Sequence, residues 1–130
     1  MRRSALELLA AHVEAFNDGV RSGDFRTMLE GFTPDAEMTF RGVPVGPFGG
    51  REAIERAYRE QPPDDELRVV GAYERDDGVI VASYAWARTP STIAGEMIIT
   101  PEDDRIASLV VTFDGPSPAD DGRATSWPEP

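Results

Sequence analysis

The N-terminal part of the chain has the hydrophobic spacing of two helices. From Leu6 to Val20, apolar side chains recur every three or four positions, which places them on one face of a helix. Ser22-Gly23-Asp24 then supplies a stop followed by a new cap. A second, short helix is predicted from Phe25 to Glu30, and Gly31 suits the position that follows a helix C-terminus.

In the next segment the spacing of apolar residues changes from that of a helix to that of a strand. Thr33-Pro34-Asp35 predicts a turn, and the strict alternation of apolar and polar residues over Ala36–Arg41 predicts a strand. Residues 42–50 hold four glycines and two prolines, which is typical of a loop. A third helix is predicted from Arg51 to about Gln61, where Pro62-Pro63 end it.

The remainder of the chain predicts strands joined by short turns. Consecutive strands of this kind favour an antiparallel meander. We therefore predict an α+β fold of order α-α-β-α-β-β-β-β, in which three N-terminal helices cover one face of a cone-like curved antiparallel or mixed sheet. The predicted C-terminal strands span residues 67–75, 79–88, 92–100 and 106–113.

Some of these strands are apolar on both faces, and that bears on assembly. The last predicted strand, Ile106–Phe113, has apolar side chains on both sides. Three helices can cover only one face of a sheet, so the other face needs a second cover. We therefore expect a homodimer.

Composition narrows the class of protein. The 130 residues suit one domain, which we assign to residues 1–115. Residues 116–130 are rich in Pro, Asp, Gly and Ser, and we expect this tail to be disordered. There is no cysteine, which excludes disulfides and thiolate metal sites. With one histidine as well, no metal site is expected.

Charge and hydropathy exclude further classes. A net charge of −11 argues against nucleic acids and anionic membranes as partners, because both are bound through clustered cations. No apolar run approaches the roughly 18 residues of a membrane span, and Glu7 and Glu14 interrupt any secretory signal. We expect a soluble cytoplasmic protein. Every basic residue is arginine, which favours a GC-rich bacterial source.

Four stretches in this order resemble the nuclear transport factor 2-like superfamily, in its SnoaL-like and ketosteroid isomerase-like branch. Ala15-Phe16-Asn17 with Ser22-Gly23-Asp24-Phe25 is similar to the exit of that family's first helix. Residues 29–38 resemble its approach to the first strand, residues 49–58 its third helix, and residues 103–113 its last strand. The resemblance implies a cone with an apolar pocket that takes a small apolar ligand.

The same resemblance implies chemistry without a cofactor. Isomerases of this kind move a proton beside a ring carbonyl, using a carboxylate base and two hydrogen-bond donors to the oxygen. Matching the first strand puts Phe40 at the position of the base, and phenylalanine accepts no proton. The same reaction by the same route is therefore not expected here.

Glu96 is the candidate acid or base. The resemblance places it at the position of the protonated carboxylic acid. Independently, alternation puts it on the same strand face as Ala94 and Ile98, both apolar. Burial favours the neutral form of a carboxyl group, which can then donate a hydrogen bond or move a proton. The alternative is a glutamate on an edge strand that reaches solvent or an arginine.

His12 and Tyr58 are the candidate hydrogen-bonding partners. The resemblance places His12 at the position of the oxyanion-binding tyrosine, and a pocket histidine could shuttle protons near neutral pH. A histidine on the solvent-facing shoulder of a helix is the alternative. Tyr58 shares the inward stripe of its helix with Ile54, where it can bind a ligand or simply cap the core.

Four aromatic side chains are expected to form the walls of the pocket. Tyr84 and Trp86 share one face of a predicted strand. Such aromatics suit a pocket, a core or a dimer interface equally well. The expected wall residues are Phe16, Phe40, Tyr84 and Trp86.

Three functions stay open at this point. The first is a cofactor-independent isomerase or cyclase that acts by proton transfer on an apolar ring carbonyl compound. The second is a non-catalytic ligand-binding or dimerisation module of the same fold, which the missing base at Phe40 favours. The third is a protein-interaction domain like the transport factor itself.

Overall fold

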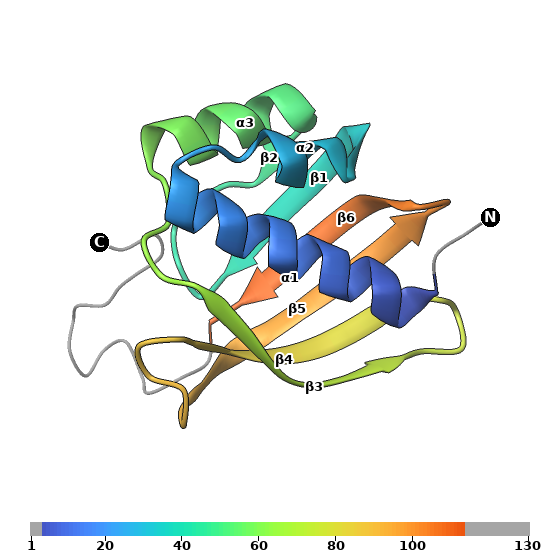
Figure 1. Ribbon diagram of the computed structural model, residues 1–130. Coiled ribbons are helices and arrows are strands. Elements are labelled where there is room, and N and C mark those ends of the chain that lie inside the picture. Colours follow the sequence, from blue (N-terminus) through green and yellow to red (C-terminus); the bar gives the residue numbers. More distant parts are fainter. Residues whose placement is uncertain (1–3, 114–130) are drawn as a thin grey trace.

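A computed structural model describes residues 4–113 as three helices and six strands (Figure 1). The helices are α1 (Ala5–Ser22), α2 (Arg26–Glu30) and α3 (Arg51–Glu60). The strands are β1 (Phe32–Arg41), β2 (Phe48–Gly49), β3 (Leu67–Glu74), β4 (Ile80–Trp86), β5 (Ile93–Glu102) and β6 (Arg105–Thr112). The predicted tail 116–130 and the predicted domain end at residue 115 lie outside the described residues.

Helix α1 is fixed at both ends by local interactions. A capping box joins Ser4 and Glu7, in which each backbone N–H donates to the other residue's side chain, at 3.0 and 3.1 Å. At the other end Gly23 adopts a φ of 83°, a conformation that glycine reaches without strain. Its N–H donates to the carbonyl of Gly19. The helix therefore ends where Ser22-Gly23-Asp24 predicts.

The strands form one mixed sheet in the order β2-β1-β6-β5-β4-β3. Strands β3 to β6 pair antiparallel as a meander, and β1 joins this meander by pairing parallel with β6. The pairing shifts register within β1, β3, β4 and β5, and such irregularities bend a sheet. In Figure 1, α1 crosses the concave face of the curved sheet, while α2 and α3 lie toward the β1 end. The predicted α+β fold class is confirmed.

Two local predictions were wrong. The segment 42–50, predicted to be entirely loop, contains β2, because Phe48 and Gly49 pair with Met38 and Glu37. The turn predicted at residues 33–35 lies within β1 instead. Phe32 already pairs with Ile106, and the register shifts between Phe32 and Glu37. The three residues therefore form an irregular part of a strand, not a reversal of the chain.

The two faces of the sheet have different surroundings. The inward side chains of β4 and β5, among them Tyr84 and Met97, are buried beneath the helices. The outward side chains include a cross-strand apolar row, defined by the pairings Tyr73–Val81, Val81–Ile98 and Ile98–Val110. We call these four residues the outer row. No helix within residues 4–113 is long and apolar enough to span a membrane.

Candidate functional site

A small cavity lies in the middle of the fold, between the helices and the concave face of the sheet. Its volume is about 20 Å³, close to the space of one water molecule. We call it the interior cavity. Its walls are His12 and Phe16 from α1, Tyr58 from α3, Leu67 from β3, Tyr84 and Trp86 from β4, Met97 from β5, and Leu109 and Val111 from β6. Five of the seven side chains predicted for the pocket are therefore brought together.

His12 is buried in the wall of this cavity, with 6% of its surface exposed. Its ring contacts Phe32 edge to face, with the ring centres 5.7 Å apart. Burial lowers the pKa of His12 from its usual 6.5 to about 4, because the charged imidazolium would lose its hydration. The imidazole is therefore neutral at pH 7 and carries one donor and one acceptor nitrogen. The alternative of a histidine exposed on a helix shoulder does not apply.

Tyr58 reaches the same cavity from α3. Its ring packs edge to face against Phe25 and Phe16, with centre-to-centre distances of 5.0 and 6.4 Å. Burial raises the pKa of Tyr58 above its usual 10.0, because the phenolate would be poorly solvated. The phenol therefore stays protonated at physiological pH and keeps the capacity to donate a hydrogen bond.

Tyr84 and Trp86 form part of the sheet side of the cavity. Their rings lie edge to face at 5.6 Å. The Tyr84 hydroxyl donates to the carbonyl oxygen of Thr112 at 3.0 Å, so it ties β4 to the end of β6. Trp86 is half-buried, in contrast to the fully buried Tyr84. Trp86 is therefore the wall residue with access to the surface on this strand.

Phe40 does not line the interior cavity. It is a buried β1 residue whose ring packs against Phe48 and Phe113, at centre distances of 6.1 and 6.2 Å. The predicted pocket wall at this position is instead part of an aromatic cluster farther along the sheet. The position that the resemblance assigns to a carboxylate base is thus packed with aromatic rings.

Glu96 lies on the opposite face of the sheet from the cavity. Its neighbours in β5, Gly95 and Met97, pair with the inward residues Tyr84 and Ala82, so Glu96 points outward. It pairs with Ser83 and is half-buried, and its N–H donates to the Thr112 hydroxyl at 2.9 Å. Of the predicted apolar face, Glu96 and Ile98 lie on the outer side, whereas Ala94 falls at a register shift and packs against the core. Contact between Glu96 and the cavity is therefore excluded by strand parity.

Sequence reasoning missed the cavity walls contributed by Leu67, Met97, Leu109 and Val111. The feature of the sequence that bears on these positions is the alternation of residues between the two faces of β5. Gly95, Met97 and Ile99 alternate with Glu96 and Ile98, and the more uniformly apolar set faces the helices. Both sets contain apolar residues, so the pattern alone did not decide which of them is inside.

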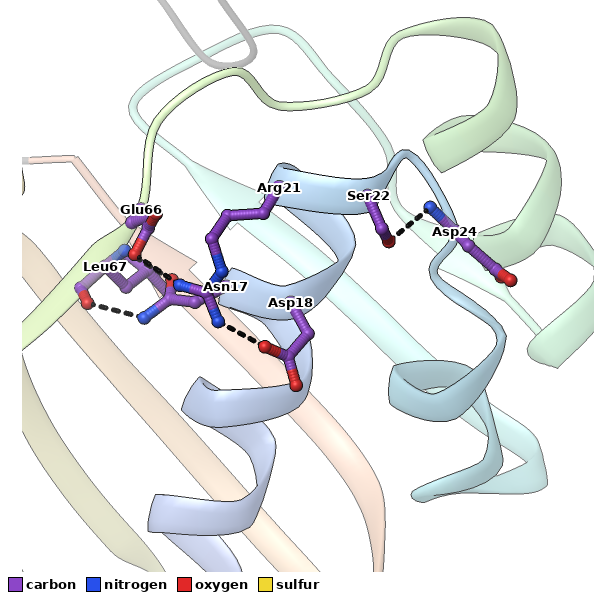
Figure 2. A network of polar contacts seen from close by, with 7 residues as sticks. All are labelled: Asn17, Asp18, Arg21, Ser22, Asp24, Glu66 and Leu67. Carbon is purple, nitrogen blue, oxygen red and sulfur yellow. Dashed lines mark hydrogen bonds and ion pairs between the residues drawn. The ribbon is translucent and has the colours of Figure 1, made fainter.

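The position of α1 over the cavity depends on Asn17. Its side-chain amide donates to the carbonyl of Leu67 at 3.1 Å and accepts from the N–H of Leu67 at 2.7 Å (Figure 2). One turn later, Arg21 pairs with Glu66 at 2.9 Å and with Asp18. These bonds join the C-terminal half of α1 to the start of β3, where Leu67 enters the cavity wall.

A larger depression lies at the surface on another side of His12. It has a volume of about 350 Å³ and is bounded by α1, α2 and the turn between β5 and β6. We call it the α1–α2 groove, and its residues are Leu8, Ala11, His12, Ala15, Thr27, Met28, Glu30, Gly31, Asp104, Arg105 and Ile106. His12 thus belongs to the walls of both the interior cavity and the groove. Within residues 4–113, no group of three or more His, Asp or Glu side chains is placed to hold a metal ion.

The family model of the SnoaL-like domain matches residues 13–124. The chain belongs to the SnoaL-like domain family. The match covers α1 from residue 13 onward, α2, α3 and every strand of the sheet, and it begins one residue after His12. No curated protein sequence matches this SnoaL-like domain.

Solved structures share the fold of this SnoaL-like domain at low sequence identity. An NTF2-like protein of unknown function from Cytophaga hutchinsonii has a TM-score of 0.65 at 16% identity, over 88% of this chain and 93% of that one. A provisionally assigned isomerase from Bacillus subtilis has a TM-score of 0.67 at 15% identity, over 86% and 90%. A provisionally assigned polyketide cyclase from Xanthomonas campestris has a TM-score of 0.63 at 17% identity, over 85% and 90%.

Proposed function

We propose that this SnoaL-like domain binds a small, largely apolar molecule in the interior cavity, through hydrogen bonds to His12 and Tyr58. The observation that carries the proposal is the composition of the cavity wall. Two buried polar side chains, from α1 and α3, meet a wall that is otherwise dominated by apolar and aromatic groups. A few placed polar groups in an apolar concavity are typical of small-molecule sites.

Binding in this cavity requires the walls to move. A volume of about 20 Å³ is far below the roughly 300–1,000 Å³ of ligand-binding pockets. Trp86 is the half-buried wall residue, and rotation of its ring away from Tyr84 would widen the cavity toward the surface. In this proposal the bound molecule takes the place of the indole beside Tyr84. The ligand is therefore expected to be planar and apolar, since it replaces an aromatic ring.

Proton transfer on a ring carbonyl compound is the second candidate function. The neutral Tyr58 phenol suits a hydrogen bond to a carbonyl oxygen, and the neutral His12 imidazole has a nitrogen that can accept a proton. Similarity of fold to proteins provisionally assigned as an isomerase and as a polyketide cyclase supports this chemistry. Against it, the described wall of the cavity contains no carboxylate, and a histidine with a pKa near 4 is a weak base. Ligand binding without turnover is therefore the function we favour.

We propose that the domain acts as a homodimer, in which two copies meet through the outer row. Tyr73 is 60% exposed and pairs with Val81, which pairs in turn with Ile98, on the face that no helix of residues 4–113 covers. Burying such a row removes apolar surface from water. The half-buried Glu96 lies on this same face, so its contacts would belong to the dimer and not to the ligand.

The experiment that tests the ligand proposal is a thermal-shift panel of planar cyclic ketones and enones. A compound that binds only the folded state raises the melting temperature by mass action. Tyr58→Phe removes one hydroxyl and should weaken binding of a carbonyl ligand by roughly fivefold, the loss of about 1 kcal/mol. Glu96→Gln is the matched control on the outer face, and it should bind as the wild type does.

Two outcomes would contradict the proposal. The first is a ligand that binds Tyr58→Phe as tightly as the wild type. The second is a ligand that is lost in Glu96→Gln. For any ligand that is found, deuterium exchange beside its carbonyl separates the two functions, because catalysis of proton transfer speeds exchange and binding alone does not.

A further inference from the structure

The α1–α2 groove has the size and lining of a binding site in its own right. Its volume of about 350 Å³ falls in the range of roughly 300–1,000 Å³ found for small-molecule sites. Apolar side chains from three elements line it, namely Leu8 of α1, Met28 of α2 and Ile106 of β6. Ala11 and Ala15 leave room above them, because their side chains are short.

His12 supplies a buried polar group to this groove. It is 6% exposed, and within residues 4–113 its nitrogens form no hydrogen bond, since its contact with Phe32 is between rings. A ligand that hydrogen-bonds to a nitrogen of His12 gains that bond at a position where little solvent competes for it. The acceptor nitrogen of a neutral imidazole can take a hydrogen bond from an N–H or O–H donor.

The charges of the groove favour a cation. It is lined by two carboxylates, Glu30 and Asp104, and by one guanidinium, that of Arg105. Arg26, four residues before Glu30, pairs with Asp24 at 2.8 Å and is attracted more weakly to Glu30, which within residues 4–113 forms no ion pair at 4.0 Å or less. The net charge of −11 also raises the local concentration of cations around the whole molecule.

We propose that the α1–α2 groove binds a small amphipathic amine. The ammonium group pairs with Glu30 and donates to the acceptor nitrogen of His12, and the apolar body lies against Leu8, Met28 and Ile106. This site is tested separately from the proposed function, because Tyr58 and the sheet aromatics do not line the groove. Only His12 is common to both sites, so it is left unchanged in the test.

The experiment is a titration with 2-phenylethylamine, followed by calorimetry or by amide chemical shifts at low salt. The comparators are 3-phenylpropanoate, which reverses the charge, and 2-phenylethanol, which removes it. We expect the amine to bind, and to bind at least fivefold more tightly than either comparator. Binding should weaken as salt is added, because the ion pair with Glu30 is near the surface.

Three variants locate the site. Ala11→Leu fills the groove and should abolish binding of the amine, whereas Ala10→Leu, on the exposed side of α1, should leave it unchanged. Glu30→Gln should weaken binding by a factor of about 1.4 to 5, the range for exposed ion pairs. The proposal is overturned if no amine binding is seen, if 3-phenylpropanoate binds as tightly, or if Ala11→Leu binds as the wild type does. The Tyr58→Phe variant should bind the amine as the wild type does. A result that contradicts the groove proposal can therefore be told apart from one that contradicts the proposed function.

Discussion

The side-chain amide of Asn17 satisfies both backbone polar groups of Leu67, at 3.1 and 2.7 Å, across fifty residues of sequence. The bond pair is partly buried and fixes α1 against the first residue of β3. Leu67 is also a wall of the interior cavity. The same contact therefore holds the helix that carries His12 and the strand that closes the cavity.

Asn17→Ala should lower the free energy of unfolding by about 1–3 kcal/mol, because it leaves a partly buried N–H and C=O without partners. Urea unfolding at pH 7 measures this loss. Arg21→Ala is the matched control one turn later, since its ion pairs with Glu66 and Asp18 are exposed. That control should cost clearly less than Asn17→Ala, because solvent screens exposed ion pairs. Equal losses in the two variants would contradict the assigned role of Asn17.

The stability of the protein should depend on pH through His12. Its pKa is about 4 in the folded state and about 6.5 when unfolded, so between these values the unfolded chain binds more protons. Stability therefore rises with pH through this window and falls as acid is added. Because of His12, the free energy of unfolding should be about 2 kcal/mol lower at pH 5 than at pH 7.5.

His12→Gln removes this titration while keeping a polar side chain. The difference in unfolding free energy between wild type and variant should change by that amount between pH 7.5 and pH 5, because the carboxylates contribute equally to both proteins. A difference that is constant with pH would show that His12 is not buried as a neutral group.

Gly95→Ala should destabilise the end of the sheet. A Cβ at this position would lie 1.8 Å from the carbonyl oxygen of Thr112, which is the acceptor of the Tyr84 hydroxyl. We expect a loss of about 1–3 kcal/mol or more from this overlap. Gly71→Ala in β3 is the control, because nothing lies within 4 Å of its added Cβ. Thermal unfolding should show a lower melting temperature for the first variant and little change for the second.

Ile98→Arg should prevent dimerisation, since it puts a charge in the middle of the outer row. Sedimentation should show a dimer for the wild type at micromolar concentration and a monomer for the variant. Ala10→Arg, on the exposed side of α1, should remain a dimer. A wild type that stays monomeric at every concentration would exclude the proposed interface.

Local structure could be predicted from the sequence where it depends mainly on interactions between residues that are close together in the chain. The three helices follow from the spacing of their apolar residues and from stop signals such as Gly23, because helices are held by bonds between near neighbours. The order of the strands along the chain follows from alternation and turn residues. The absence of a base at Phe40 could also be predicted, because phenylalanine has no ionisable group in any fold. The sequence likewise predicts a pocket lined by His12, Phe16, Tyr58, Tyr84 and Trp86, and these five side chains line the interior cavity.

Tertiary structure alone decided which face of each strand is inside. Glu96 and Met97 are adjacent and point to opposite faces of β5. Both faces carry apolar residues, so the sequence did not show which of the two faces is inside. The pairing of Gly95 with Tyr84 and of Met97 with Ala82 resolves it, because cross-strand partners share a face. The parallel pairing of β1 with β6, the size of the interior cavity and the α1–α2 groove likewise come from contacts between distant segments. Such contacts depend on how whole elements pack, and no local pattern encodes them.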